Sequence, residues 1–198
     1  MIRMLAEAAF AMSGIGRILL FRPDWSDRFN LTERGLVRSF GAALIALPVY
    51  ALMHAFFWQI SPAGTPVQPL WYFAIDLARL WLLFPVVAAL AVMVTGLKRD
   101  YAAWLTVRNW SVLAQILVVT LIAATHVAGL TGQVFLAYFF VLFYPVFVTV
   151  LHLSIAFAVL RGPWQRVAGA GMIVVLADFV SREGMQALAT ALNPVQPS

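Results

Sequence analysis

The sequence contains no cysteine and little charge. Without cysteine there are no disulfides, thiolate metal sites or cysteine-bound iron–sulfur clusters. Charged residues make up only 11% of the 198 residues, whereas 63% are apolar. A soluble domain must cover its exterior with polar groups, so this composition argues against a water-soluble protein. The length suits a single domain.

The few basic residues are almost all arginine, and they fall in alternate connections between the apolar stretches. The connections at 61–69 and 129–133 carry no charge. Three other segments hold eleven of the thirteen basic residues: Arg3, Arg17, Arg22, Arg28, Arg34 and Arg38, then Lys98, Arg99 and Arg108, then Arg161 and Arg166. Lys and Arg stay on the cytoplasmic side during insertion. The alternation therefore predicts a multi-pass protein of the bacterial inner membrane with a cytoplasmic N-terminus and a periplasmic C-terminus.

This topology also explains the net charge of +5. The positive charge follows from retention of arginine on one face, so nucleic acid is not an expected partner. The lipid bilayer is the expected surrounding, and its anionic headgroups favour basic segments by roughly 1 kcal/mol per Lys or Arg. A membrane-protein partner or a second copy of the chain is a further possibility.

The apolar stretches predict an all-α bundle of five transmembrane helices. A span needs about 20 residues, and the segments of suitable length lie at about 39–60, 70–97, 109–128, 134–160 and 167–187. The last is the weakest, because its uncharged part covers only 167–177. A four-span protein with a C-terminal interfacial helix is the alternative. Residues 31–192 form the transmembrane domain, followed by a short tail at 193–198.

Residues 1–30 are predicted to form a cytoplasmic interfacial helix and a turn. The helix has apolar residues at three- and four-residue spacing, as expected for a helix lying in the interface. These residues are Met1, Leu5, Ala8, Met12, Ile15 and Leu19. Asn30, with Glu33 three positions later, is predicted to cap the next helix. Trp104 and Trp110 are predicted to lie in the inner aromatic belt.

Six ionisable residues inside the predicted spans are the main functional candidates, because such groups are costly in a bilayer. They are His54, Asp76, Arg79, His126, Asp178 and Arg182. At about 1.5 Å per residue they lie roughly 18–30 Å from the cytoplasmic boundary, which predicts one cluster in the outer leaflet. Asp76 can reach Arg79, and Asp178 can reach Arg182, along their own helices. The cluster is either a structural polar network, which is the favoured interpretation, or a site that binds a small polar or anionic ligand or relays protons.

A second pair is predicted nearer the cytoplasmic side. Gln115 and His152 come to similar depths and are predicted to hydrogen-bond between two spans, as a contact that holds helices together. The depths of His54 and His126 would also suit a bis-histidine haem, but nothing else in the sequence specifies one. No cofactor and no metal site are therefore predicted.

The layout of the chain resembles that of a known group of membrane proteins. A first span is entered through Arg34-Gly35-Leu36-Val37-Arg38-Ser39-Phe40, and a basic loop, KRDYAAWLTVRNW at 98–110, leads into the third. Over residues 30–182 this resembles uncharacterised five-span membrane proteins of alphaproteobacteria and, more distantly, the Yip family. The resemblance implies membrane organisation or partner binding without catalytic residues.

The sequence contains no P-loop, GxSxG, HExxH or dinucleotide-binding glycine pattern, and no enzyme activity is predicted. The preferred interpretation is a non-enzymatic membrane-organising or accessory protein. The alternative is a small transporter or channel-like subunit that uses the polar cluster.

Overall fold

The computed structural model describes residues 2–61 and 70–192, and every long element in these ranges is helical, as predicted. The elements are α1 (Ile2–Leu19), η1 (Pro23–Arg28), α2 (Glu33–Ser39), α3 (Ala42–Ile60), α4 (Leu70–Thr95), η2 (Lys98–Asp100), α5 (Tyr101–Val127), α6 (Gln133–Tyr138), η3 (Phe139–Phe143), α7 (Tyr144–Val159) and α8 (Trp164–Leu192). The described ranges contain no β-strand. Met1, most of the connection at 61–69 and the tail at 193–198 lie outside them.

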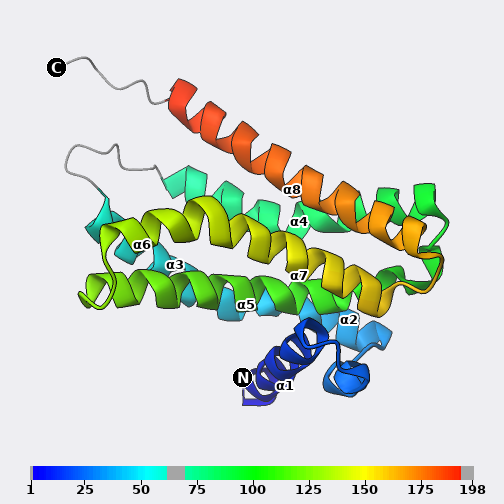
Figure 1. Cartoon of the computed structure of the whole chain (residues 1–198). Coiled ribbons are helices and arrows are strands. Elements are labelled where there is room, and N and C mark those ends of the chain that lie inside the picture. The colour runs from blue at the N-terminus through cyan, green and yellow to red at the C-terminus, as the bar shows by residue number, and fades with distance from the viewer. Residues whose placement is uncertain (1, 62–69, 193–198) are drawn as a thin grey trace.

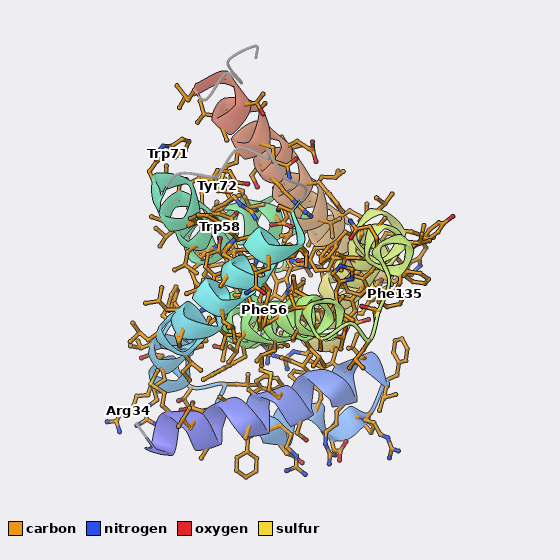
Figure 2. The ribbon with its side chains drawn as sticks, turned by 90° about the vertical axis from the view of Figure 1, so that its left-hand side faces the viewer. Arg34, Phe56, Trp58, Trp71, Tyr72 and Phe135 are labelled. Atoms are coloured by element: carbon orange, nitrogen blue, oxygen red, sulfur yellow. The ribbon has the colours of Figure 1, made fainter. Side chains whose placement is uncertain are left out.

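The long helices form a bundle with α5 at its centre. Helix α3 packs extensively against α5, and α8 packs against α4 and α7. Helix α1 lies across one side of this bundle, where it contacts α5 and α7 (Figures 1 and 2). The first half of α5 is buried without interruption from Trp104 to Leu113. Trp104 and Trp110 are therefore core residues, and their predicted place in an aromatic belt is wrong.

Four helical stretches are long and apolar enough to cross a membrane: Glu33–Ile60, Trp71–Thr95, Lys98–Val127 and Gln133–Val159. Helix α8 is not among them. It has 29 residues, a length that could span, but its second half contains Asp178, Arg182 and Glu183. In Figure 1, α8 runs beside α4 and diverges from α7 toward its C-terminal end.

The basic connections meet at one end of the bundle, which we call the basic end (Lys98, Arg99, Arg161 and Arg166). A carboxylate joins two of them: Arg161 donates from Nη2 to Asp100 Oδ1 at 2.5 Å and from its backbone N–H to Oδ2 at 3.0 Å. These side-chain hydrogen bonds raise the pKa of Arg161, so its guanidinium stays protonated. Figure 2 views the opposite end, where Trp58, Trp71 and Tyr72 gather.

The N-terminal helix is amphipathic as predicted, but its buried stripe is rotated by about one position. The residues that face the bundle are Ala8, Ala11, Ile15 and Ile18, and Leu5 is half exposed at 51%. The small side chains at positions 8 and 11 allow close approach to the bundle. The face that packs is therefore made by Ala8, Ala11, Ile15 and Ile18, and the larger Leu5 lies outside it.

The cap of α2 also differs from the prediction. Thr32 is the N-cap, and its Oγ1 accepts a hydrogen bond from the Gly35 N–H at 3.2 Å. Asn30 Oδ1 instead accepts from the Thr32 hydroxyl at 2.6 Å and from its N–H at 3.2 Å. Asn30 thus orients the capping threonine and does not cap the helix itself.

The fourth candidate span contains a π-helical turn, η3, immediately before α7. Pro145, at the start of α7, has no N–H to give to the Val141 carbonyl one turn earlier. A wider π-helical turn accommodates such an interruption, and turns of this kind are frequent at functional sites.

Candidate functional site

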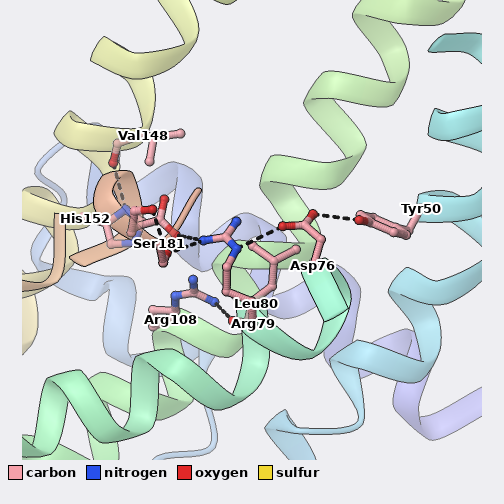
Figure 3. A network of polar contacts seen from close by, with 9 residues as sticks. Tyr50, Asp76, Arg79, Leu80, Arg108, Val148, His152 and Ser181 are labelled. Atoms are coloured by element: carbon pink, nitrogen blue, oxygen red, sulfur yellow. Dashed lines mark hydrogen bonds and ion pairs between the residues drawn. The ribbon is translucent and has the colours of Figure 1, made fainter. Parts of the chain in front are cut away.

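A chain of polar contacts joins α3, α4 and α8 inside the bundle, centred on Arg79. Arg79 donates from Nε to Asp76 Oδ1 at 2.9 Å and from Nη1 to Asp178 Oδ1 at 2.7 Å. The same Nη1 donates to Ser181 Oγ at 3.0 Å, and Tyr50 donates its hydroxyl to Asp76 Oδ2 at 2.7 Å. Figure 3 shows these side chains in a row. One guanidinium thus bridges two carboxylates from different helices.

The bridge is largely enclosed by protein. The side chain of Arg79 is 11% exposed, and those of Asp76 and Asp178 are 21% and 24% exposed. Charges at such sites need partners, because an unpaired charge in a low-dielectric interior is very costly. The predicted Asp76–Arg79 pair is present. Asp178 pairs with Arg79 on α4, whereas the prediction gave it Arg182 on its own helix.

A cavity of about 310 Å³ lies beside this chain of contacts, and its wall includes Tyr50, Asp76, Arg79 and Asp178. Aromatic side chains from α3, α4, η3 and α7 make up much of the remaining wall: Tyr50, Phe57, Tyr72, Phe140 and Tyr144. Helix α8 contributes Asp178, Arg182 and Gln186. The volume lies at the lower end of the range for small-molecule sites, and an apolar wall with a few converging polar groups is typical of them.

Five of the six predicted cluster residues line this cavity: His54, Asp76, Arg79, Asp178 and Arg182. The ring of His54 packs against those of Tyr50 and Phe73, with centroids 4.4 and 4.2 Å away. The guanidinium of Arg182 lies 5.7 Å from the centre of the Tyr144 ring. His126 does not line this cavity. The structure therefore unites five of the six residues and leaves His126 apart.

The predicted hydrogen bond between Gln115 and His152 is absent. Gln115 lines the cavity, and its Nε2 is buried without a partner among the described residues. His152 points elsewhere: its Nδ1 lies 2.9 Å from the Val148 carbonyl, and its Nε2 is likewise without a partner in the described part of the chain. Similar depth along two helices did not bring the two side chains together.

His152 instead lies next to the Arg79 network. A small gap of about 10 Å³ is lined by Arg79, Arg108, His152 and Asp178. The two layers predicted from depth are therefore neighbours in one polar region.

Arg108 is the residue that the sequence reasoning missed. The prediction assigned it to a cytoplasmic basic loop, but it lies inside α5 and is only 3% exposed. Its Nη1 donates to the Leu80 carbonyl at 2.7 Å (Figure 3). Its guanidinium lies 4.7 Å from the centre of the Phe84 ring. Positive-inside reasoning treats each arginine as a boundary marker and cannot recognise one that the fold buries.

Comparison of the chain with family models, with curated proteins and with solved structures gives no match. The class of protein therefore rests on its own features. Helix length and hydropathy define a candidate multi-pass membrane protein, and the polar-walled cavity is its candidate functional site.

Proposed function

We propose that the protein binds a small polar ligand in this cavity, as a small transporter or channel-like subunit in the membrane. The observation that supports the proposal most is the position of the Asp76–Arg79–Asp178 bridge. A bridge that only held helices together would be favoured by close packing on all sides. Here its charged groups border a cavity of about 310 Å³, large enough for a compact small molecule.

The proposal includes a complete topology. Helix α8 makes a fifth crossing, supported by the pairing of its Asp178 with Arg79 inside the bundle. The basic end and the N-terminus face the cytoplasm of a bacterial cell, because arginines concentrate there. The protein acts without catalysis. The resemblance to the Yip family, which rests on span order, is kept as part of this proposal and names no ligand.

An accessory role in membrane organisation is the second candidate. It is favoured by the outward face of the N-terminal region, where Leu5, Phe10 and Phe21 are exposed at 51%, 54% and 83%. Arg22, Arg34 and Arg38 are exposed in the same region. Apolar side chains next to arginines suit anionic headgroups at the membrane surface. This role and the cavity function can exist in the same molecule.

The cavity function is tested by filling the cavity. Val119 on α5 lines the cavity and is buried, whereas Leu121, two residues along the same helix, is 64% exposed. Val119→Phe places a ring in the cavity, and Leu121→Phe is the matched control on the outer surface. The purified variants are compared by thermal unfolding with a panel of small carboxylates, phosphates, amines and neutral amides.

We expect at least one compound to stabilise the wild type and Leu121→Phe in a saturable way, because a ligand that binds only the folded state stabilises it. Val119→Phe should fold and lose this response. If no compound in the panel stabilises the wild type, or if Val119→Phe responds as the wild type does, the cavity is not a ligand site.

A further inference from the structure

The charges around the cavity do not balance. Within the described residues, the cavity and the small gap beside it are lined by two carboxylates, Asp76 and Asp178, and by three guanidiniums, Arg79, Arg108 and Arg182. The cavity itself has two charges of each sign, and the surplus positive charge of the region comes from Arg108 in the gap beside it. Glu183, the next acidic residue on α8, is exposed and lines neither space. An uncompensated charge inside a bundle is costly, so an anion in the cavity would lower the free energy of this region.

Arg182 is the cation available for an anion. Arg79 is shared between its two carboxylates, and Arg108 donates to a backbone carbonyl away from the main cavity. Arg182 lies against the face of the Tyr144 ring and forms no ion pair among the described residues. A guanidinium oriented by an aromatic ring keeps its N–H edge for a planar carboxylate or a phosphate.

Unpartnered polar groups in the wall also indicate a ligand. Gln115 is 8% exposed, and its Nε2 has no partner in the described ranges, nor does Nε2 of His54. Both side chains line the cavity. A buried polar atom without a hydrogen bond is unfavourable, and a ligand with its own oxygen atoms removes that cost.

The aromatic wall restricts the rest of the ligand. Tyr50, Phe57, Phe140 and Tyr144 line the same cavity as Arg182, and Tyr144 lies against its guanidinium. Rings of this kind favour an apolar or aromatic body, and the volume of about 310 Å³ limits its size. On the side of Arg182 and Gln186, the wall is formed by α8, the helix that diverges from α7 (Figure 1).

We infer that the ligand is an organic monoanion whose carboxylate or phosphate binds Arg182 and whose apolar body packs against the aromatic wall. This inference rests on the proposed cavity function and gives its ligand a chemical class. A soluble organic acid and the anionic head of a lipid share this chemistry.

Three probes of matched shape and different charge test the inference on the full-length protein in neutral detergent. Benzoate is the anion, benzamide the neutral analogue and benzylamine the cation. We expect saturable thermal stabilisation by benzoate alone. Arg182→Gln should weaken the apparent affinity at least about ten-fold, as expected for loss of a charged hydrogen-bonding partner. Arg182→Lys keeps the charge and should retain most of the response.

Arg166→Gln is the matched control, because Arg166 is exposed in the first turn of the same helix, away from the cavity. It removes one positive charge and should respond to benzoate as the wild type does. The lipid source is tested in nanodiscs of phosphatidylglycerol or of phosphatidylcholine. Stabilisation by phosphatidylglycerol that Arg182→Gln abolishes supports a lipid head, and stabilisation by benzoate that Arg182→Gln abolishes supports a soluble acid.

The inference is overturned if benzamide or benzylamine stabilises as well as benzoate, if Arg182→Gln responds like the wild type, or if neither anion acts. The proposed cavity function fails separately. It survives a neutral or cationic ligand whose effect Val119→Phe removes. It fails when no compound in the wider panel binds, or when Val119→Phe responds as the wild type does.

Discussion

Two links between aspartate and arginine, one at the basic end and one inside the bundle, lie in different surroundings. At the basic end, the Asp100 side chain is buried at 4% exposed, but its partner Arg161 is 68% exposed. Within the bundle, Arg79 is 11% exposed and binds two carboxylates at once. The first link joins two connections, and the second joins α4 to α8.

The difference shows how surroundings set the effect of the same chemical pair. A pair whose cation is exposed is screened by water and salt, and it contributes less to stability than a pair whose cation is enclosed. A buried arrangement contributes through the penalty that arises when one partner is lost. Substitution of Arg79 should therefore lower the free energy of unfolding by more than the loss of its hydrogen bonds alone. Substitution of Asp100 should lower it less.

The largest effect is expected for Arg79→Leu. It leaves Asp76 and Asp178 facing each other without their cation, and breaking a buried pair costs about 3–5 kcal/mol. We expect a loss of that size in the free energy of unfolding, measured by denaturant titration in detergent. Arg166→Leu, at an exposed position on α8, should unfold like the wild type. Equal stability of the two variants would contradict the expected sensitivity of the Arg79 bridge.

A smaller effect is expected where α8 approaches α7. A Cβ at Gly171 would lie 2.9 Å from Leu153 Cδ2 and 3.3 Å from Ala156 Cβ, whereas a Cβ at Gly184 would meet nothing within 4 Å. Gly171→Leu should push α8 away from the bridge and cost about 1–3 kcal/mol. Gly184→Leu should be neutral or slightly stabilising, because glycine is unfavourable within a helix. A thermal unfolding comparison that ranks the two variants the other way would contradict this packing.

The smallest effect is expected for Asp100→Asn at the basic end. The variant should lose a little stability at low salt. Its amide oxygen can still accept from the Arg161 guanidinium, whereas its NH2 group cannot accept the hydrogen bond from the Arg161 backbone N–H. At about 1 M salt, where the screening length is about 3 Å, the difference from the wild type should shrink. Thermal unfolding at several salt concentrations measures this. A large loss of stability that salt does not change would contradict the expected screening and would place this link in the same class as the one at Arg79.

The sequence was sufficient to predict the helical class, the approximate ends of most long helices and the pairing of Asp76 with Arg79. It missed the start of α5, which begins at Tyr101 and not near residue 109. Counting along a helix gives height, and the pair lies on one helix, so its members had to be close. Height does not give rotation about the helix axis. These helices are apolar on nearly all sides, so their faces could not be read from periodicity. For this reason Gln115 and His152, at similar heights, were wrongly predicted to bond.

The partners of the polar bridge could not be predicted either. Tyr50 and Ser181 have ordinary side chains for a span, and only tertiary packing brings them to Asp76 and Arg79. Arg108 was hidden by its position next to a basic loop. A signal did exist: Trp104 lies one turn before it and Trp110 two residues after it in an apolar helix, which is unusual for an exposed connection.

The most direct test of the central claim uses the absence of cysteine from the chain. Gln115→Cys places one thiol in the cavity wall, and Leu121→Cys places one on the outer surface of the same helix. A thiol in apolar surroundings stays protonated and unreactive. If the cavity admits small polar molecules, a water-soluble thiol reagent should label the cysteine at 115 at least about ten-fold faster than the cysteine at 121. Benzoate should slow the labelling at 115. Equal labelling at both positions, unaffected by benzoate, would contradict a ligand site between these helices.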